Sequence, residues 1–257
     1  MAYIPAVRLR LIILISSILL TSCTKNVDSL PLNEQALNLS SRFDSDLDAD
    51  DYRNPLEILD FSELTPGMKI VDILGGGGYY SELFNHIVGE SGQVYLQNNS
   101  LFLRFSKDEL IQRLRHNRLA NVTRLDSEYS DMKLPVKADI IFLGLSYHDF
   151  FVQKSDPIIT AVPEDFYRQI KASLKPNGII ILIDHAAAPD TGISMTSKLH
   201  RIDENWVQSD MHDNGFELIE TLNTLRNHND TYDLKIWDPQ VRHKTDRFIH
   251  KYKLIGK

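Results

Sequence analysis

The sequence is poor in cysteine and has no excess of positive charge. Its single cysteine among 257 residues excludes a disulfide framework and a zinc site built from cysteines. Its 28 Lys and Arg residues against 35 Asp and Glu residues give a formal charge of −7. A nucleic-acid partner is therefore not expected. The composition, 42% hydrophobic and 25% charged, is that of a globular chain of one or at most two domains.

The first 22 residues differ from the rest of the chain. Arg8 and Arg10 precede an apolar run over residues 11–20, which has the length of a signal peptide and is short for a membrane span of about 20 residues. The segment Leu20-Thr-Ser-Cys23 that follows resembles the bacterial lipobox. We therefore interpret residues 1–22 as a lipoprotein signal peptide.

The only cysteine, Cys23, stands at the position that this resemblance predicts to be lipidated. Several acyl chains anchor a protein stably, so we expect the membrane to be a partner through the lipid on Cys23. Thr24 follows the cysteine where aspartate would direct inner-membrane retention, so the outer membrane is favoured and the protein would face the periplasm. The alternative is a plain signal anchor with an incidental cysteine.

Residues 23–42 are polar with weak periodicity, so we interpret them as a tether and place the folded domain at residues 43–257. Asp44, Asp46 and Asp48 alternate as in a calcium loop. Such a loop would need glycine at Ala49 and glutamate at Pro55. This acidic segment is therefore interpreted as the solvated entry to a helix.

Strand and helix patterns alternate along the predicted domain. Apolar spacing predicts helices after the glycines at 75–78, around 107–116, from Pro163, and over 203–214. Alternation of helices with apolar strands predicts an α/β fold with a doubly wound, mostly parallel sheet. The expected strands are 69–74, 93–97, 121–125, 138–144, 178–183, 216–219 and 248–254.

Four consecutive glycines, Gly75, Gly76, Gly77 and Gly78, lie between the first expected strand and the helix after it. Glycine lets the backbone turn sharply and approach a ligand closely, and a helix N-terminus offers unpaired amides. The context predicts a cofactor or nucleotide site. The alternative is a tight strand-to-helix turn that binds nothing.

The segment from Val71 to Ser81 resembles the first motif of class I S-adenosylmethionine-dependent methyltransferases. More narrowly, residues 43–255 resemble a bacterial group of predicted methyltransferases of undefined substrate. The resemblance implies a Rossmann-like, seven-stranded sheet with an antiparallel last strand, S-adenosylmethionine as cofactor, and a role for Asp72 and Gly75–Gly78 in binding it. The shared features are Arg53-Asn-Pro55, Thr65-Pro-Gly-Met68, Gly76-Gly-Gly-Tyr79, Leu145-Ser-Tyr-His-Asp149, Ile183-Asp-His185, Leu199-His-Arg-Ile-Asp-Glu204 and Asp238-Pro through Lys244-Thr-Asp-Arg-Phe248.

The sequence departs from the superfamily pattern at two positions. Leu74 stands where the first glycine of the signature is usual, and Asn98 stands where an acidic residue usually holds the ribose hydroxyls. A hydrogen bond from an amide contributes about 0.5–1.5 kcal/mol, against about 1.5–3 kcal/mol for a charged partner, so Asn98 should weaken binding without abolishing it. The resemblance places the adenine contact at Asp126, with Asp131 as the competing residue.

The resemblance also places acceptor-holding residues after the fourth expected strand, where Tyr147, His148 and Asp149 follow directly. Two further sets, Asp184-His185 at the end of the central strand and His200 beyond it, reach the same rim of the sheet. All six are candidate catalytic residues. His148 is the first choice for proton acceptor, with Asp149 or Asp184 orienting its ring.

The histidines at 148, 185 and 200 with Asp149 or Asp184 also form a nitrogen–oxygen donor set for a metal. Their spacing matches no known ligand motif, so no metal site is predicted.

Taken together, these features predict an S-adenosylmethionine-dependent methyltransferase acting on a small-molecule or envelope acceptor. The alternative is a non-catalytic envelope binding protein on the same scaffold, because fold alone does not fix function. Leu74 and Asn98 favour the alternative. The glycine loop and the histidine–carboxylate sets favour the enzyme.

Overall fold

The computed structural model describes residues 27–135, 137–153 and 160–256. The predicted signal peptide and Cys23 lie outside this part of the chain. Within it, no helix combines the length and the apolar character that crossing a membrane requires.

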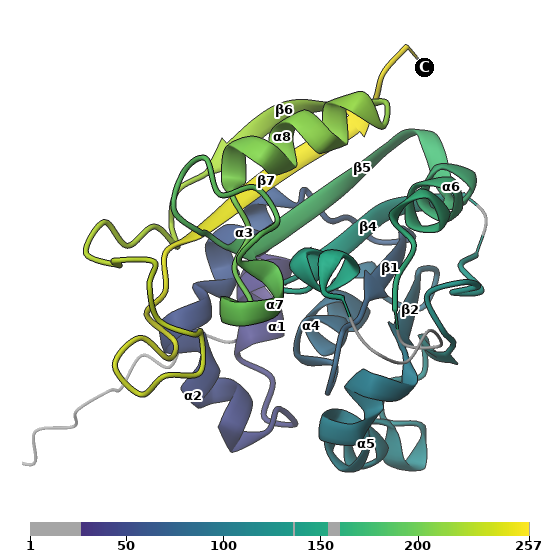
Figure 1. The fold of residues 1–257 in the computed structure, drawn as a ribbon. Helices are drawn as coiled ribbons and strands as arrows, with labels where there is room; N and C mark the ends of the chain where they lie inside the picture. The colour runs from purple at the N-terminus through teal and green to yellow at the C-terminus, as the bar shows by residue number, and fades with distance from the viewer. Residues whose placement is uncertain (1–26, 136, 154–159, 257) are drawn as a thin grey trace, which may run out of the picture.

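The structure is built on one seven-stranded sheet with the strand order β3-β2-β1-β4-β5-β7-β6 (Figure 1). Strand β7 runs antiparallel to both of its neighbours, and the other pairs are parallel. The predicted fold class is confirmed, including the antiparallel last strand. The strands are β1 (Lys69–Ile73), β2 (Gln93–Asn98), β3 (Val122–Asp126), β4 (Ala138–Gly144), β5 (Leu174–His185), β6 (Phe216–Leu222) and β7 (Arg247–Leu254).

Helices cover both faces of this sheet because its central strands are apolar on both sides. Ile70 packs with helices α1, α3 and α4 on one face, whereas Val71 and Ile73 pack with α6 and α8 on the other. The α-helices are α1 (Leu32–Leu37), α2 (Asp44–Arg53), α3 (Pro55–Phe61), α4 (Tyr79–Val88), α5 (Ser100–Leu114), α6 (Pro163–Ser173), α7 (Thr196–Leu199) and α8 (Glu204–Asp213), and the 3-10 helices are η1 (Val27–Ser29), η2 (Arg115–Asn117) and η3 (Tyr147–Phe151).

Two elements begin earlier than the sequence predicted. Helix α5 starts at Ser100 because the side chain of Asn99 caps it, accepting a hydrogen bond from the amide of Phe102 at 2.9 Å. Strand β5 starts at Leu174, which pairs with Ala138 before an irregularity in the register.

The N-terminal segment is more ordered than a tether. Helix α1 lies within residues 23–42, and its Ala36 is fully buried in the core beside α3 and α4. The packed part of the chain therefore begins before residue 43.

The acidic segment forms α2. One of its carboxylates is buried, contrary to the prediction of a solvated segment. Asp46 is buried and pairs with Arg113 of α5 at 2.6 Å. Arg113 also pairs with Glu82 of α4 at 2.5 Å. A buried guanidinium needs such partners, so these contacts tie α2 to the two helices that flank the glycine loop.

Candidate functional site

A cavity of about 840 Å³ lies at the carboxyl ends of the parallel strands, where sheets of this kind bind ligands. One wall comes from the glycine loop and α5, and the opposite wall from the segments that follow β4, β5 and β6. The lining is mostly apolar with a small group of histidines and one carboxylate. The lining residues are Gly76, Leu101, Phe102, Phe105, Ser106, Leu145, His148, Asp149, Val152, His185, His200, Ile236 and Trp237.

The four glycines of the loop have different roles, and only Gly76 lines the cavity. Gly76 has a φ of +59°, and a Cβ built there would meet nothing within 4 Å. A Cβ at Gly77 would instead lie 2.3 Å from the carboxylate carbon of Glu109, and one at Gly78 would lie 2.7 Å from Leu96. Gly76 therefore exposes backbone to the cavity, whereas Gly77 and Gly78 allow close packing.

Leu74 has a left-handed backbone conformation. Its φ is +53°, in the region that costs a side-chain-bearing residue roughly 1–2 kcal/mol and that glycine adopts readily. Its amide donates to the side chain of Gln97 at 3.2 Å, which holds the start of the loop. The leucine at this position therefore adds backbone strain that a glycine would avoid.

Asn98, predicted to contact the ribose, is bonded to the glycine loop. Its side-chain oxygen accepts from the amide of Gly76 at 2.9 Å, and its side-chain nitrogen donates to the Gly76 carbonyl at 2.9 Å. The residue is fully buried and does not line the cavity. Because both ends of the amide are engaged by the loop, Asn98 positions Gly76 rather than holding a ribose.

Asp72 and Gly75 also support the loop from outside the cavity. The Asp72 carboxylate accepts from the Ser81 hydroxyl at 2.6 Å, and a Cβ at Gly75 would lie 2.5 Å from it. Burial raises the pKa of Asp72 to about 7, against the opposing effects of the Ser81 hydrogen bond and of Arg53.

The two candidates for the adenine contact also lie away from the cavity. Asp126 ends β3 and forms an ion pair with Arg124 at 2.7 Å, with 46% of its side chain exposed. Asp131 is exposed and accepts from the amide of Lys133. Neither lines the cavity.

His148 is fixed by a buried carboxylate of the neighbouring strand. It lies in η3, directly after β4, and its Nδ1 is 2.7 Å from Oδ1 of Asp184 at the end of β5. The amide of His148 donates to the other Asp184 oxygen, also at 2.7 Å. Nδ1 therefore carries a proton, and in the neutral ring Nε2 is an acceptor. The orienting residue is Asp184.

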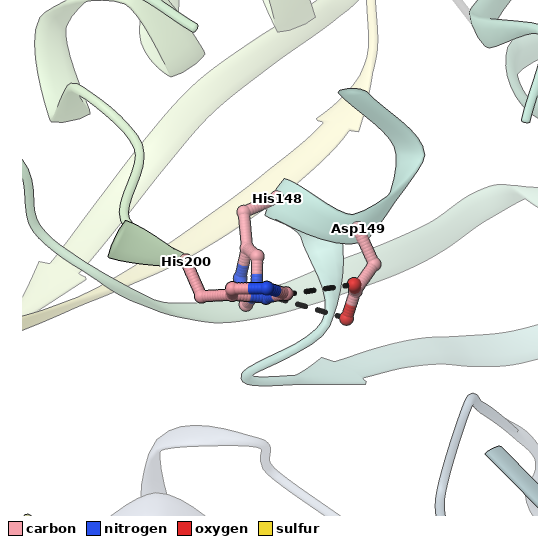
Figure 2. A group of neighbouring side chains, drawn as sticks. All are labelled: His148, Asp149 and His200. Carbon is pink, nitrogen blue, oxygen red and sulfur yellow. Dashed lines mark hydrogen bonds and ion pairs between the residues drawn. The ribbon is translucent and has the colours of Figure 1, made fainter. Parts of the chain in front are cut away.

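The acceptor nitrogen of His148 faces His200 and Asp149 (Figure 2). Nε2 lies 3.2 Å from Nδ1 of His200 and 3.7 Å from a carboxylate oxygen of Asp149. The Asp149 carboxylate is 3.9 Å from Nδ1 of His200. The structure thus brings together four of the six predicted catalytic residues, His148, Asp149, Asp184 and His200.

The other two predicted catalytic residues are placed differently. His185 lines the cavity, but its Nδ1 lies 2.7 Å from the hydroxyl of Thr245. Burial, reinforced by the nearby charges of His148 and Arg247, holds the pKa of His185 well below its usual value, so the ring stays neutral.

Tyr147 does not line the cavity, contrary to the prediction. Its hydroxyl donates to Asp210 of α8 at 2.6 Å and also bonds Tyr167 within the core. Tyr147 and His148 are adjacent in η3 but their side chains leave it in different directions. Their adjacency in the sequence could not predict that His148 lines the cavity and Tyr147 does not.

The apolar wall of the cavity was missed by the sequence analysis. Phe102 and Phe105 come from the first turns of α5, and Ile236 and Trp237 come from the long β6–β7 connection. The Trp237 ring lies 4.4 Å from the His200 ring. The only signal for this wall was a tryptophan, one of two in the chain, in a segment without periodicity.

Known proteins resemble this chain both in sequence and in fold. No family model matches the chain. The ubiquinone/menaquinone biosynthesis C-methyltransferase UbiE of Haemophilus ducreyi is 43% identical over 53 residues, 20% of each chain. The UbiE of Shewanella sp. strain ANA-3 is 27% identical over 128 residues, 49% of this chain and 46% of that protein. The chain thus spans less than half the length of these curated relatives.

Two solved structures have the same fold. A SAM-dependent methyltransferase from Aquifex aeolicus matches with a TM-score of 0.56 and 20% identity, covering 83% of this chain and all of that one. Fibrillarin from Aeropyrum pernix, solved with bound S-adenosyl-L-methionine, matches with a TM-score of 0.50 and 14% identity, covering 79% of this chain and 76% of that one. The strand order, the antiparallel β7 and these two matches show that the chain has the Rossmann-like fold of S-adenosylmethionine-dependent methyltransferases.

Proposed function

We propose that this protein transfers a methyl group from S-adenosylmethionine to an apolar acceptor that carries an ionisable group. One observation carries the proposal: Gly76 and the His148 ring line the same cavity. Gly76 belongs to the loop that follows β1, and His148 belongs to η3 after β4, the neighbouring strand. A ligand on the loop would therefore lie beside the group that can accept a proton.

The residues present fit the cofactor at the glycine loop. The positive φ of Gly76 and the open space at its Cβ position provide a backbone surface that a ligand can approach closely. Gly76 would contact S-adenosylmethionine, in a loop that Gly75, Gly77 and Gly78 shape, with α5 providing an apolar wall. When bound, this cofactor supplies an electrophilic methyl group. The superfamily usually has a ribose-binding carboxylate at the position of Asn98. In this chain the Asn98 amide bonds the backbone of Gly76 instead.

The histidine cluster provides the acid–base chemistry. His148 Nε2 would accept the proton that the acceptor's hydroxyl or acidic C–H group loses when it gains the methyl group, which leaves the cofactor as the neutral thioether. Asp184, bonded to Nδ1, keeps Nε2 available and stabilises the positive charge that the ring gains. A positioned base of this kind contributes roughly 10²–10⁴ in rate.

The cavity wall indicates the acceptor class. Leu101, Phe102, Phe105, Ile236 and Trp237 form an apolar surface that ends at the polar cluster. We propose an acceptor with an apolar, ring-bearing body and a hydroxyl at one end, either a small molecule or an envelope lipid. The names of the relatives, which place them in ubiquinone and menaquinone biosynthesis, support this class.

We also propose that the chain is lipidated at Cys23 and acts at the bacterial envelope, facing the periplasm. The lipobox-like segment at residues 20–23 and the position of the only cysteine support this proposal. Both lie outside the described residues.

The proposed function is tested by titrating the full chain, in detergent, with S-adenosylmethionine. Gly76→Val should abolish saturable binding because its side chain would occupy the space that the ligand approaches. Gly89→Val is the matched control: Gly89 also has a positive φ, +61°, with nothing within 4 Å of its Cβ position, but it caps the far end of α4. The control places the same side chain at another positive φ, away from the cavity, and should still bind.

Equal binding by wild type and Gly76→Val would show that the loop is merely a turn. An absence of binding in the wild type would favour the non-catalytic envelope binding protein.

A further inference from the structure

We propose that His148, Asp149 and His200 form a binding site for a divalent transition-metal cation, for which Zn²⁺ is the probe. These are the residues whose donor atoms lie within 4.8 Å of one another in the part of the chain that the structure describes. The inference goes beyond methyl transfer, because cation binding is measured without S-adenosylmethionine or an acceptor.

The spacing of the donor atoms suits a metal. The two ring nitrogens are 3.2 Å apart. Oδ2 of Asp149 lies 3.7 Å from Nε2 of His148, and Oδ1 of Asp149 lies 3.9 Å from Nδ1 of His200. Donor atoms bound to a tetrahedral Zn²⁺ at about 2.0–2.2 Å lie roughly 3.3–3.6 Å apart. A cation bound by the two nitrogens would therefore reach Asp149 after a small shift of its carboxylate.

The surroundings orient the ligands as metal sites require. Asp184 accepts from Nδ1 of His148, which leaves Nε2, 3.2 Å from Nδ1 of His200, as the nitrogen that can bind a cation. Carboxylates that bond the second nitrogen of a ligating histidine typically fix its tautomer and raise its basicity. The Trp237 ring packs at 4.4 Å from the ring of His200 on the cavity side. His200 needs only to carry its proton on Nε2, so neither neutral histidine has to lose one.

The donor set and its exposure indicate the class of cation. Two imidazole nitrogens and one carboxylate suit first-row transition metals, whereas Mg²⁺ and Ca²⁺ prefer oxygen ligands. His148 is 2% exposed in its side chain, Asp149 10% and His200 17%, and all three line the cavity. Three protein ligands beside an open cavity leave a coordination position for water or a ligand oxygen.

Cation binding has one consequence for the chemistry proposed above. The Nε2 lone pair of His148 can bind either a proton or a cation. Proton acceptance by His148 is therefore confined to protein without metal, and cation affinity should fall as the pH is lowered.

The test is a titration of the full chain, purified in detergent and stripped with chelator, with Zn²⁺ by calorimetry and with Co²⁺ by visible absorption. We expect one equivalent per chain and Co²⁺ bands typical of nitrogen–oxygen ligation. Mg²⁺ in excess should not compete. His200→Ala and Asp149→Ala should each abolish tight binding, and Asp184→Asn, which alters the orienting group, should weaken it about 10–100-fold.

Two histidines provide matched controls. His185→Ala removes an imidazole whose ring centre lies 6.2 Å from that of His148 in the same cavity, and His212→Ala removes one whose side chain is 71% exposed. Both variants should bind Zn²⁺ like wild type. Circular dichroism should show that every variant is folded.

The experiment also separates this inference from the proposed function. Gly76→Val should lose S-adenosylmethionine binding and keep Zn²⁺ binding, and His200→Ala should do the reverse. The inference is overturned if wild type shows no saturable one-to-one binding, or if His185→Ala weakens binding as much as His200→Ala does. Neither result would bear on cofactor binding.

Discussion

At the scale of single residues, Asp72 links the glycine loop to α4 through a carboxylate that the fold buries. It is 2% exposed, and it accepts a hydrogen bond from the Ser81 hydroxyl at 2.6 Å. Burial penalises the charged form, so the pKa of Asp72 rises to about 7 despite the hydrogen bond from Ser81. Its protonation therefore couples the stability of this part of the fold to pH.

The first residue-scale prediction concerns this coupling. Between pH 4 and pH 7 the folded state retains a proton on Asp72 that the unfolded state has released, so the free energy of unfolding falls as the pH rises through this range. Asp72→Asn cannot titrate. Its stability relative to wild type should therefore rise by up to about 4 kcal/mol between pH 4 and pH 8.

Urea unfolding of both proteins across this pH range measures the difference. Asp48→Asn, which changes an exposed aspartate of α2, is the control and should track wild type. A constant difference between Asp72→Asn and wild type at every pH would show that Asp72 does not titrate in this range.

The candidate site shows which residues sequence reasoning can place. His148, Asp149, Asp184 and His200 were grouped because parallel strands end at one edge of a sheet, and this topology does bring them together. The opposite orientation of Tyr147 depends on the turn of η3, which topology does not specify.

At the scale of elements, the glycine loop is held by its neighbours on two sides. Asn98 of β2 makes two hydrogen bonds to the backbone of Gly76. Arg113 of α5 donates to the Gly77 carbonyl at 2.5 Å, and its charge is balanced by the buried Asp46 and Glu82. The loop conformation is thus set by β2, α2, α4 and α5 together.

The element-scale prediction is that Asn98→Asp loosens the loop. The family pattern alone would predict tighter cofactor binding, because it places an acidic residue there. In this structure the substitution removes the hydrogen bond to the Gly76 carbonyl and sets a carboxylate against it, at 2.9 Å. Losing that bond costs about 1–3 kcal/mol, so affinity for S-adenosylmethionine should fall about tenfold.

Titration calorimetry measures the affinity, and thermal unfolding should show a lowered midpoint. Tighter binding by Asn98→Asp would contradict the positioning role and restore the ribose contact.

Elements differed in how far the sequence could predict them. Apolar runs identified the central strands β1, β4 and β5, because a strand buried on both faces must be apolar throughout. The last strand, β7, was instead predicted from its period-two alternation. The start of α5 depended on one capping side chain, Asn99. The connection that supplies Ile236 and Trp237 has no periodicity, and only tertiary contacts bring it to the cavity.

At the scale of the whole molecule, the residues that stabilise the fold and those of the candidate site lie in different parts of the sheet. The core lies between the sheet and its helices, whereas the glycine loop, His148 and His185 all follow the carboxyl ends of β1, β4 and β5. The described chain begins at Val27, close after the proposed lipidation site. A lipidated protein would face the periplasm, although S-adenosylmethionine is made in the cytosol. If the chain is lipidated, S-adenosylmethionine would have to reach the cavity from the periplasm.

The whole-molecule prediction concerns this anchor. Cys23→Ser removes the only thiol of the chain, so no acyl chain can be attached by a lipoprotein pathway. We expect the variant to leave the membrane fraction or to remain unprocessed, because acyl chains contribute about 0.8 kcal/mol per buried methylene to anchoring. Ser22→Ala, which keeps a small residue before the cysteine, should be processed and retained like wild type. Intact-mass analysis of the membrane fraction decides the matter, since a processed wild-type chain with an unmodified cysteine would rule out lipidation.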